Sequence, residues 1–335
     1  MKPHRLACPA WATAALLTSI QGVLAQGPLT PPGAPAPTMR STLLALLLTP
    51  LLLHAGTTID PAAAHAYAAN LGWLNARGDV ANGAVIGEFV CEGFIYSANA
   101  GWISLGSGAP ADGIRYRNNS AADCGVNTQD FSSANGTMEA KLRGYAYGSN
   151  VGWINFEDIG NPRVDLANGQ LRGSCYSANA GWIVLEGVGV SVRSLAFVPG
   201  VDSDRDGIAD AWERFYARNL TTMTALTDSD GDGSTDLDEY AADTNPLLRS
   251  DALRITHFVP PRQLVPLGPF LTDLAFTSKP TRWYSIEANT DLPGPWRPQV
   301  ENLLPAAGGV SLISFRDSAG LQRYYRVRAK LPLAP

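Results

Sequence analysis

The chain has 335 residues, 45% of them apolar and 16% charged, so it can form two or three domains with buried cores. This composition excludes a charged disordered tail, and 33 glycines and 24 prolines indicate many turns and short strands. The net charge of -5 excludes a globally basic nucleic-acid-binding protein, because phosphate binding requires a surplus of lysine and arginine.

Residues 1–56 contain two signal-like segments in tandem. Lys2 and Arg5 precede a first apolar run, and Met39 opens a second, TLLALLLTPLLL, which ends before small residues at Gly56. A short apolar run between basic and small residues is typical of a secretory signal peptide. We expect Met39 to be the true start and the mature protein to be secreted or held at the cell surface. A run of about a dozen residues is short for a membrane span, so we expect none in the mature chain; a membrane anchor is the alternative.

Residues 57–198 form a predicted repeat domain. Its four segments HAYAANLGWLN, FIYSANAGWIS, YAYGSNVGWIN and CYSANAGWIVL share a tyrosine, an Asn-x-Gly sequence and a tryptophan. Period-two runs around Asn-x-Gly predict a strand, a tight turn and a second strand. The aromatic positions are Tyr67, Tyr96, Tyr147 and Tyr176 with Trp73, Trp102, Trp153 and Trp182. Four hairpins indicate an all-β domain: a sandwich, a barrel or a short solenoid.

The repeated aromatic residues allow two interpretations. They can pair across each hairpin and fill the core, with each asparagine bonded to its own turn, or they can stack on carbohydrate rings. Repetition in all four copies favours the structural role, because a fold needs every copy and a binding site does not. The phrase Tyr-Ser-Ala-Asn-x-Gly-Trp-Ile resembles repeats in exported bacterial proteins of unknown role. That resemblance covers residues 64–186 and implies export rather than an activity.

Three cysteines follow the leader: Cys91, Cys124 and Cys175. An exported protein favours disulfides, and three cysteines leave one unpaired. We predict a bond between Cys91 and Cys124, because both flank the same inserted loop. Cys175 lies in a strand pattern and is expected to be a small buried apolar residue.

The acidity of the chain is concentrated in one segment. Residues 202–243 hold 12 acidic and 3 basic residues, whereas the rest of the mature chain is nearly neutral. Within this segment, DSDRDGIADAWE (residues 202–213) and DSDGDGSTDLDE (residues 228–239) both match the twelve-residue calcium loop. Side chains at positions 1, 3, 5, 9 and 12 and the carbonyl at position 7 supply the oxygen ligands. The predicted ligands of two Ca²⁺ ions are Asp202, Asp204, Asp206, Ile208, Asp210 and Glu213, and Asp228, Asp230, Asp232, Ser234, Asp236 and Glu239.

These loops resemble the EF-hand loop, the dockerin repeat and the Asp-rich thrombospondin type 3 repeat over residues 202–246. We expect short helices over 209–219 and 236–242 after the loops. No helix is expected before the first loop, so a complete EF-hand is not predicted. The helix residues also lack the small hydroxyl pair through which dockerins bind cohesins. Two ions are expected to stiffen the joint between the repeat domain and the C-terminal domain.

Residues 251–335 alternate short β-branched and aromatic runs with proline and glycine. Six or seven strands in this length predict a small β-sandwich. The phrases around Trp283, Trp296 and Tyr324 are similar to C-terminal modules that follow Asp-rich calcium repeats in secreted proteins of environmental bacteria. The resemblance implies an accessory or surface-display role.

No serine-hydrolase elbow, zinc-binding helix or phosphate-binding loop is present in the sequence. The chain is therefore expected to be a mainly β, non-enzymatic, secreted calcium-binding surface, adhesion or scaffold protein. It consists of a leader (1–56), a repeated hairpin domain (57–198), a calcium segment (199–250) and a sandwich (251–335). A carbohydrate-binding module and an extracellular hydrolase with two carboxylates are the alternatives. A cell-surface glycan or protein is the expected partner.

Overall fold

The computed structural model describes residues 56–335 except 135, 265–267, 291–293, 318–322 and 335. The predicted leader and the start at Met39 lie outside the described residues. The fold is mainly β, as predicted, with two short helices in the described part. None of the helices described is long and apolar enough to cross a membrane.

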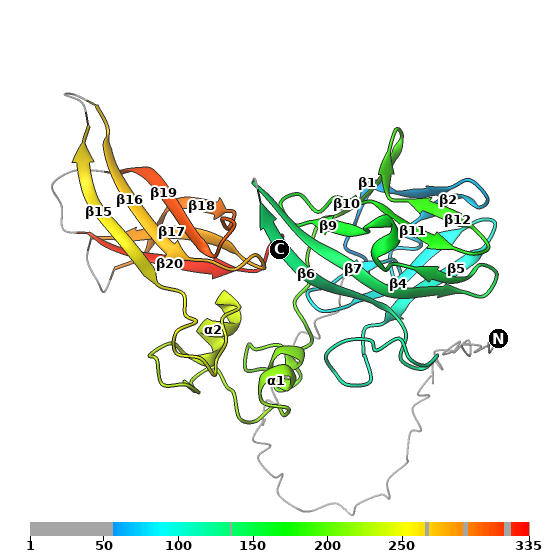
Figure 1. Cartoon of the computed structure of the whole chain (residues 1–335), viewed down its shortest axis with the longest axis horizontal. Helices are drawn as coiled ribbons and strands as arrows, with labels where there is room; N and C mark the ends of the chain where they lie inside the picture. Colours follow the sequence, from blue (N-terminus) through cyan, green and yellow to red (C-terminus); the bar gives the residue numbers. More distant parts are fainter. Residues whose placement is uncertain (1–55, 135, 265–267, 291–293, 318–322, 335) are drawn as a thin grey trace, which may run out of the picture. The chain divides into compact units, whose positions relative to one another are not determined.

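The four repeated hairpins form a closed eight-stranded barrel (Figure 1). Its strands are β1 (Ile59–Ala68), β2 (Gly72–Asn75), β4 (Cys91–Ser97), β5 (Gly101–Ser107), β7 (Thr137–Gly148), β8 (Gly152–Asn155), β11 (Ser174–Ser177) and β12 (Gly181–Val184). Each strand pairs antiparallel with the next in this order, and β12 pairs with β1. Closure leaves these strands without a free edge and decides among the three architectures that the sequence allows.

Six further strands extend this sheet around the barrel. They are β3 (Val85–Ile86), β6 (Val126–Ala134), β9 (Arg163–Asp165), β10 (Leu171–Arg172), β13 (Glu186–Gly187) and β14 (Val190–Ser194), with a 3-10 turn η1 (Asp158–Gly160). The insertion between the two pairs of hairpins supplies β6, which pairs with the long strand β7. These strands extend the sheet beyond the hairpins, and Val126 of β6, Leu171 of β10 and Val192 of β14 line the same interior as the hairpin residues.

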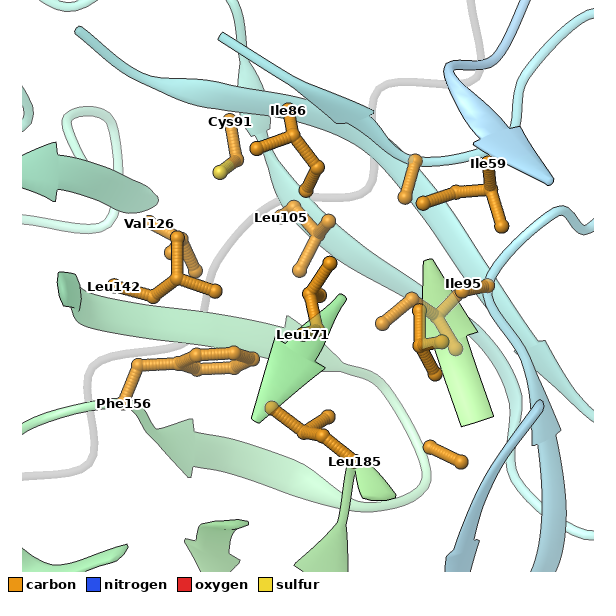
Figure 2. Close-up of a pocket in the computed structure, with 14 residues that line it drawn as sticks. Ile59, Ile86, Cys91, Ile95, Leu105, Val126, Leu142, Phe156, Leu171 and Leu185 are labelled. Carbon is orange, nitrogen blue, oxygen red and sulfur yellow. The ribbon is translucent and has the colours of Figure 1, made fainter. Parts of the chain in front are cut away.

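The barrel interior is filled by apolar side chains from every hairpin. The inward pairs of the four hairpins are Ala66 with Leu74, Ile95 with Ile103, Ala146 with Ile154, and Cys175 with Ile183. The remaining cavity is about 20 Å³ and is lined only by apolar and cysteine side chains that point inward (Figure 2). On this measure one water molecule needs about 10–15 Å³, so the space holds about one water molecule and is too small for a sugar or another organic ligand.

The cysteines occupy different environments, so the predicted Cys91–Cys124 disulfide is wrong. The Cys91 thiol is buried in the barrel core, 3.8 Å from the hydroxyl oxygen of Thr128, and burial raises its pKa to about 11. The thiol of Cys124 lies in the inserted loop and donates to the carbonyl of Ala121 at 3.5 Å. Cys175 is 3% exposed, which confirms its prediction as a small buried residue.

One end of the barrel is closed by the four Asn-x-Gly turns. The turn glycines have φ angles of 71° to 75°, which permit the tight reversal, but the asparagines do not bond their own turns as predicted. The amide nitrogens of three of them instead donate to a carbonyl of the neighbouring turn. These bonds join Asn99 to Leu71 at 2.9 Å, Asn150 to Ala100 at 3.2 Å, and Asn179 to Val151 at 3.1 Å. The repeated asparagine of the motif thus links one hairpin to the next.

The C-terminal segment forms the predicted sandwich of two three-stranded sheets. One sheet contains β15 (Ile255–Gln263), β16 (Phe270–Thr277) and β19 (Val310–Asp317), and the other β17 (Trp283–Asn289), β18 (Arg297–Leu303) and β20 (Tyr324–Lys330). Its core brings Phe276 and Phe315 of the first sheet against Tyr284 and Ile286 of the second. Inward residues alternate with outward residues along these strands, as expected for two packed sheets.

We expect Asn150→Ala to destabilise the barrel by about 1 kcal/mol, because the carbonyl of Ala100 loses its amide donor in a partly buried site. Urea unfolding followed by circular dichroism measures the change. The matched control is Asn119→Ala, since Asn119 is exposed in the inserted loop. Equal stability of the two variants would contradict a structural role for the links between turns.

Candidate calcium centres

The two acidic loops each lead directly into a short helix. These are α1 (Asp210–Tyr216) and α2 (Asp236–Ala242), the second with the predicted bounds. The helix α1 ends before the predicted Asn219, because Arg218 adopts a left-handed φ of 62°. Among the described residues no helix lies between β14 and the first loop, as expected from the sequence.

Backbone hydrogen bonds fold both loops in the same way. The carboxylate at position 1 accepts the amides of positions 4 and 6: Asp202 accepts them at 2.7 and 3.0 Å, and Asp228 at 2.7 and 2.9 Å. Gly207 and Gly233 at position 6 have φ angles of 97° and 98°, a region that favours glycine. The repeated spacing therefore corresponds to a repeated conformation.

The first three acidic positions of each loop converge, as predicted. One carboxylate oxygen from each of Asp202, Asp204 and Asp206 lies within 4.8 Å of the others. Asp228, Asp230 and Asp232 form an equivalent group. Three carboxylates so close together repel one another unless a cation lies among them.

Each loop also carries a buried glutamate at position 12, close enough to the aspartates for their charges to act on it. Glu213 is fully buried and Glu239 is 1% exposed. Neither oxygen of Glu213 has a hydrogen-bond partner, and one oxygen of Glu239 has none. Burial, followed by the charge of Asp204 for Glu213 and of Asp230 for Glu239, raises the pKa of each carboxyl to about 7. A buried carboxylate without a partner is costly, and such oxygens fit a hard divalent cation.

The aspartates at position 9 bond a serine of their own loop, and their predicted role as ion ligands stays a prediction. Both oxygens of Asp210 accept hydrogen bonds from Ser203, from its amide at 2.7 Å and from its hydroxyl at 2.8 Å. Asp236 binds Ser229 in the same way, at 3.0 and 2.9 Å. Neither aspartate belongs to the converging groups. They hold the loop through a serine at position 2, which sequence reasoning missed although it occurs in both loops.

The residues at position 7 anchor the loops. The amide of Ile208 donates to Asp206 at 2.9 Å, and the amide of Ser234 donates to Asp232 at 2.7 Å. The Ile208 side chain is fully buried and packs with Trp212 in a small core below the loops. The predicted role of the two carbonyl oxygens as ligands stays a prediction.

Two arginines outside the motif bind the second loop. Arg254 donates to the carboxylate of Asp232 at 2.8 Å, and Arg249 donates to the carbonyl of Asp230. The Ser234 amide, together with Arg254, lowers the pKa of Asp232. The loop pattern does not reveal these contacts, because both arginines follow the motif and reach it only through folding.

The outer face of the barrel carries the repeated aromatic pairs. Each tyrosine lies directly across its hairpin from the tryptophan, as predicted, with ring centroids 4.9 to 5.2 Å apart. The expectation that they fill the core is wrong, because the four tryptophans are between 36% and 52% exposed. Strand alternation directs the smaller neighbouring residues inward and these rings outward.

A polar cavity of about 420 Å³ is lined by Glu88, Asp130 and Asp243, among other residues. Glu88 forms an ion pair with Arg282 at 2.8 Å, and Asp243 accepts the hydroxyl of Thr281 at 2.5 Å. Asp130 lies 3.7 Å from the ammonium group of Lys141. Each of these carboxylates therefore has a partner of its own.

We expect the pKa values of Glu213 and Glu239 to make the ion-free protein sensitive to pH. Both pKa values are raised from 4.5 to about 7, so between these values the folded protein binds more protons than the unfolded chain. Their contribution to the free energy of unfolding is complete below about pH 4.5 and is lost as the pH rises through about 7.

Urea unfolding of the ion-free protein from pH 4.5 to 7.5 measures this effect. The matched control is the double variant Glu213→Gln and Glu239→Gln, which cannot ionise at these positions. The difference in stability between wild type and control should fall with rising pH. A difference that is constant or rises with pH would contradict the raised pKa values.

No protein-family model, curated protein or solved structure matches this chain. The resemblance of residues 202–246 to calcium repeats therefore rests on the loop residues themselves. Two observations from the structure accompany it: the converging aspartates and the buried glutamates with oxygens that have no hydrogen-bond partner. The assignment of these loops as candidate calcium centres depends on this chain alone.

Proposed function

We propose that the chain is a secreted, non-enzymatic scaffold or surface protein in which two calcium ions stiffen the segment between the barrel and the sandwich. The observation that carries this proposal is the pair of buried glutamates, Glu213 and Glu239, with unpartnered oxygens beside converging aspartates. A disordered acidic linker would leave these carboxylates in water, where burial would not raise their pKa values.

Each ion would be held by the first three aspartates of a loop and its glutamate: Asp202, Asp204, Asp206 and Glu213, or Asp228, Asp230, Asp232 and Glu239. The ion supplies a positive charge that offsets the repulsion among four carboxylates. Calcium suits such a set better than magnesium, which retains water in its coordination shell. Extracellular calcium modules bind with dissociation constants of roughly 10⁻⁴ to 10⁻³ M, which suits a structural ion outside the cell.

We expect isothermal titration of the ion-depleted protein with calcium to give two sites. Glu213→Gln and Glu239→Gln should each remove one site, because each glutamate belongs to a different loop. Saturating calcium should raise the melting temperature of the wild type by mass action.

The control for this titration is Asp238→Asn. Asp238 lies on α2 beside Glu239 but is exposed, and it bonds the Thr235 hydroxyl at 3.0 Å. This variant should keep both sites. Absence of calcium binding by the wild type, with identical melting in calcium and in chelator, would contradict the proposed function.

Binding of a carbohydrate is a second candidate function. The exposure of the four tryptophans favours it, since flat aromatic rings stack on sugar faces. Asn75 lies next to Tyr96, and Asn155 next to Tyr176, in the register between hairpins. A polar amide thus lies beside a ring at two of the four junctions between hairpins, and Ser104 lies beside Tyr147 at a third. The filled interior directs any such binding to the outer surface.

A glycan array with Trp102→Ala and Trp182→Ala tests this second function. If the rings bind sugar, both substitutions should reduce a wild-type signal at least tenfold, because stacking is lost without a change in the core. Phe258→Ala is the control, since Phe258 is a similarly exposed aromatic residue on the sandwich. No glycan signal from the wild type would exclude this function on the array tested.

A further inference from the structure

A buried ion pair joins the barrel to the sandwich. Arg282 is 2% exposed, and its guanidinium group lies 2.8 Å from the carboxylate of Glu88, which is 5% exposed. Glu88 follows β3 in the barrel and Arg282 precedes β17 in the sandwich. Removing one member of such a pair leaves the other buried and unpaired, so the contact is sensitive to the position of both partners.

The helix α2 of the second loop completes this contact. Arg282 donates to the carbonyls of Tyr240 at 2.9 Å and Ala241 at 3.0 Å. The hydroxyl of Tyr240 donates to the second carboxylate oxygen of Glu88 at 2.9 Å. Tyr240 therefore bonds the barrel with its side chain and the sandwich with its backbone.

The same helix contains a predicted ion ligand at the adjacent position. Glu239 precedes Tyr240, and the Thr244 hydroxyl at the end of the helix donates to its carboxylate at 3.2 Å. Since α2 has seven residues, a change in the position of Glu239 displaces Tyr240 as well. Arg254, at the start of the sandwich segment, binds Asp232 in the same loop.

The helix α1 of the first loop has no equivalent among the described contacts. Its Trp212 ring packs against Tyr240 at 5.7 Å, and Arg214 pairs with Asp210 of its own loop at 3.5 Å. Neither contact reaches the sandwich. The two loops therefore have the same conformation, but among the contacts described here only α2 bonds both the barrel and the sandwich.

We propose that Glu88, Tyr240 and Arg282 form an interdomain latch that depends more on the ion of the second loop, whose helix makes the contacts, than on that of the first, which reaches Tyr240 only through Trp212. This inference rests on the proposed function. An ion bound through Glu239 fixes α2, and α2 then holds the carbonyls and the hydroxyl that orient Arg282 and Glu88. Tyr240 is a positioning residue in this latch, because it acts through its two charged neighbours.

Differential scanning calorimetry of the full chain tests the latch, with calcium titration of each variant in parallel. In saturating calcium the barrel and the sandwich should melt in one transition, and without calcium in two. Glu239→Gln should lose one ion and melt in two transitions in calcium. Glu213→Gln should lose one ion but keep the single transition.

Tyr240→Phe separates the latch from ion binding. This change keeps the ring contact with Trp212 and removes only the hydroxyl bonded to Glu88. The variant should bind two ions and yet melt in two transitions, whereas Phe215→Tyr, which adds a hydroxyl to an exposed ring of α1, should behave as wild type.

The outcomes distinguish the latch from the proposed function. Wild type that binds no calcium overturns both. Two bound ions with equal effects of the two glutamine variants on the transitions overturn the latch alone. The latch is also overturned by a single transition for Tyr240→Phe in calcium, or by a wild type whose number of transitions does not depend on calcium.

Discussion

The central constraint on this structure is the burial of two carboxylates that carry oxygens without a hydrogen-bond donor: both oxygens of Glu213 and one of Glu239. Glu213 and Glu239 lie beside groups of converging aspartates, where their negative charge opposes folding unless a proton or a cation compensates it. The surrounding loops are built to maintain this arrangement. Serines at position 2 and amides at positions 4, 6 and 7 hold the aspartates, and the small core around Trp212 supports the helices. A proton or a cation bound in this segment therefore stabilises its folded state.

The barrel is subject to a different constraint, because a closed sheet of four similar hairpins leaves a narrow interior. Pairs such as Ala66 with Leu74 and Ala146 with Ile154 put one small and one larger side chain inward, which fits a narrow eight-stranded interior. The large rings then have no room inside and lie on the outer face. The asparagines of the turns join neighbouring hairpins at one end. Any binding by this domain therefore belongs to its outside.

The acidic segment contacts both the barrel and the sandwich. Phe89 of the barrel packs on the small core of the calcium segment, while Arg282 of the sandwich binds the end of α2. A cation that fixes the loops also fixes the surface on which these contacts are made. Under the proposed function, calcium binding and the joining of the domains are parts of one equilibrium.

Local sequence patterns were sufficient to predict several elements of this protein. The spacing of Asp228 to Glu239 determined the loop and the bounds of α2, and Asn-x-Gly determined the turns, because both depend on hydrogen bonds between residues near in sequence. Only the tertiary structure decided which face of a strand points inward, since alternation is the same for either face. It also decided that Asn150 bonds another turn, that Cys91 and Cys124 form no disulfide with each other, and that Arg282 meets Glu88. These contacts join residues distant in sequence, and no local spacing encodes them.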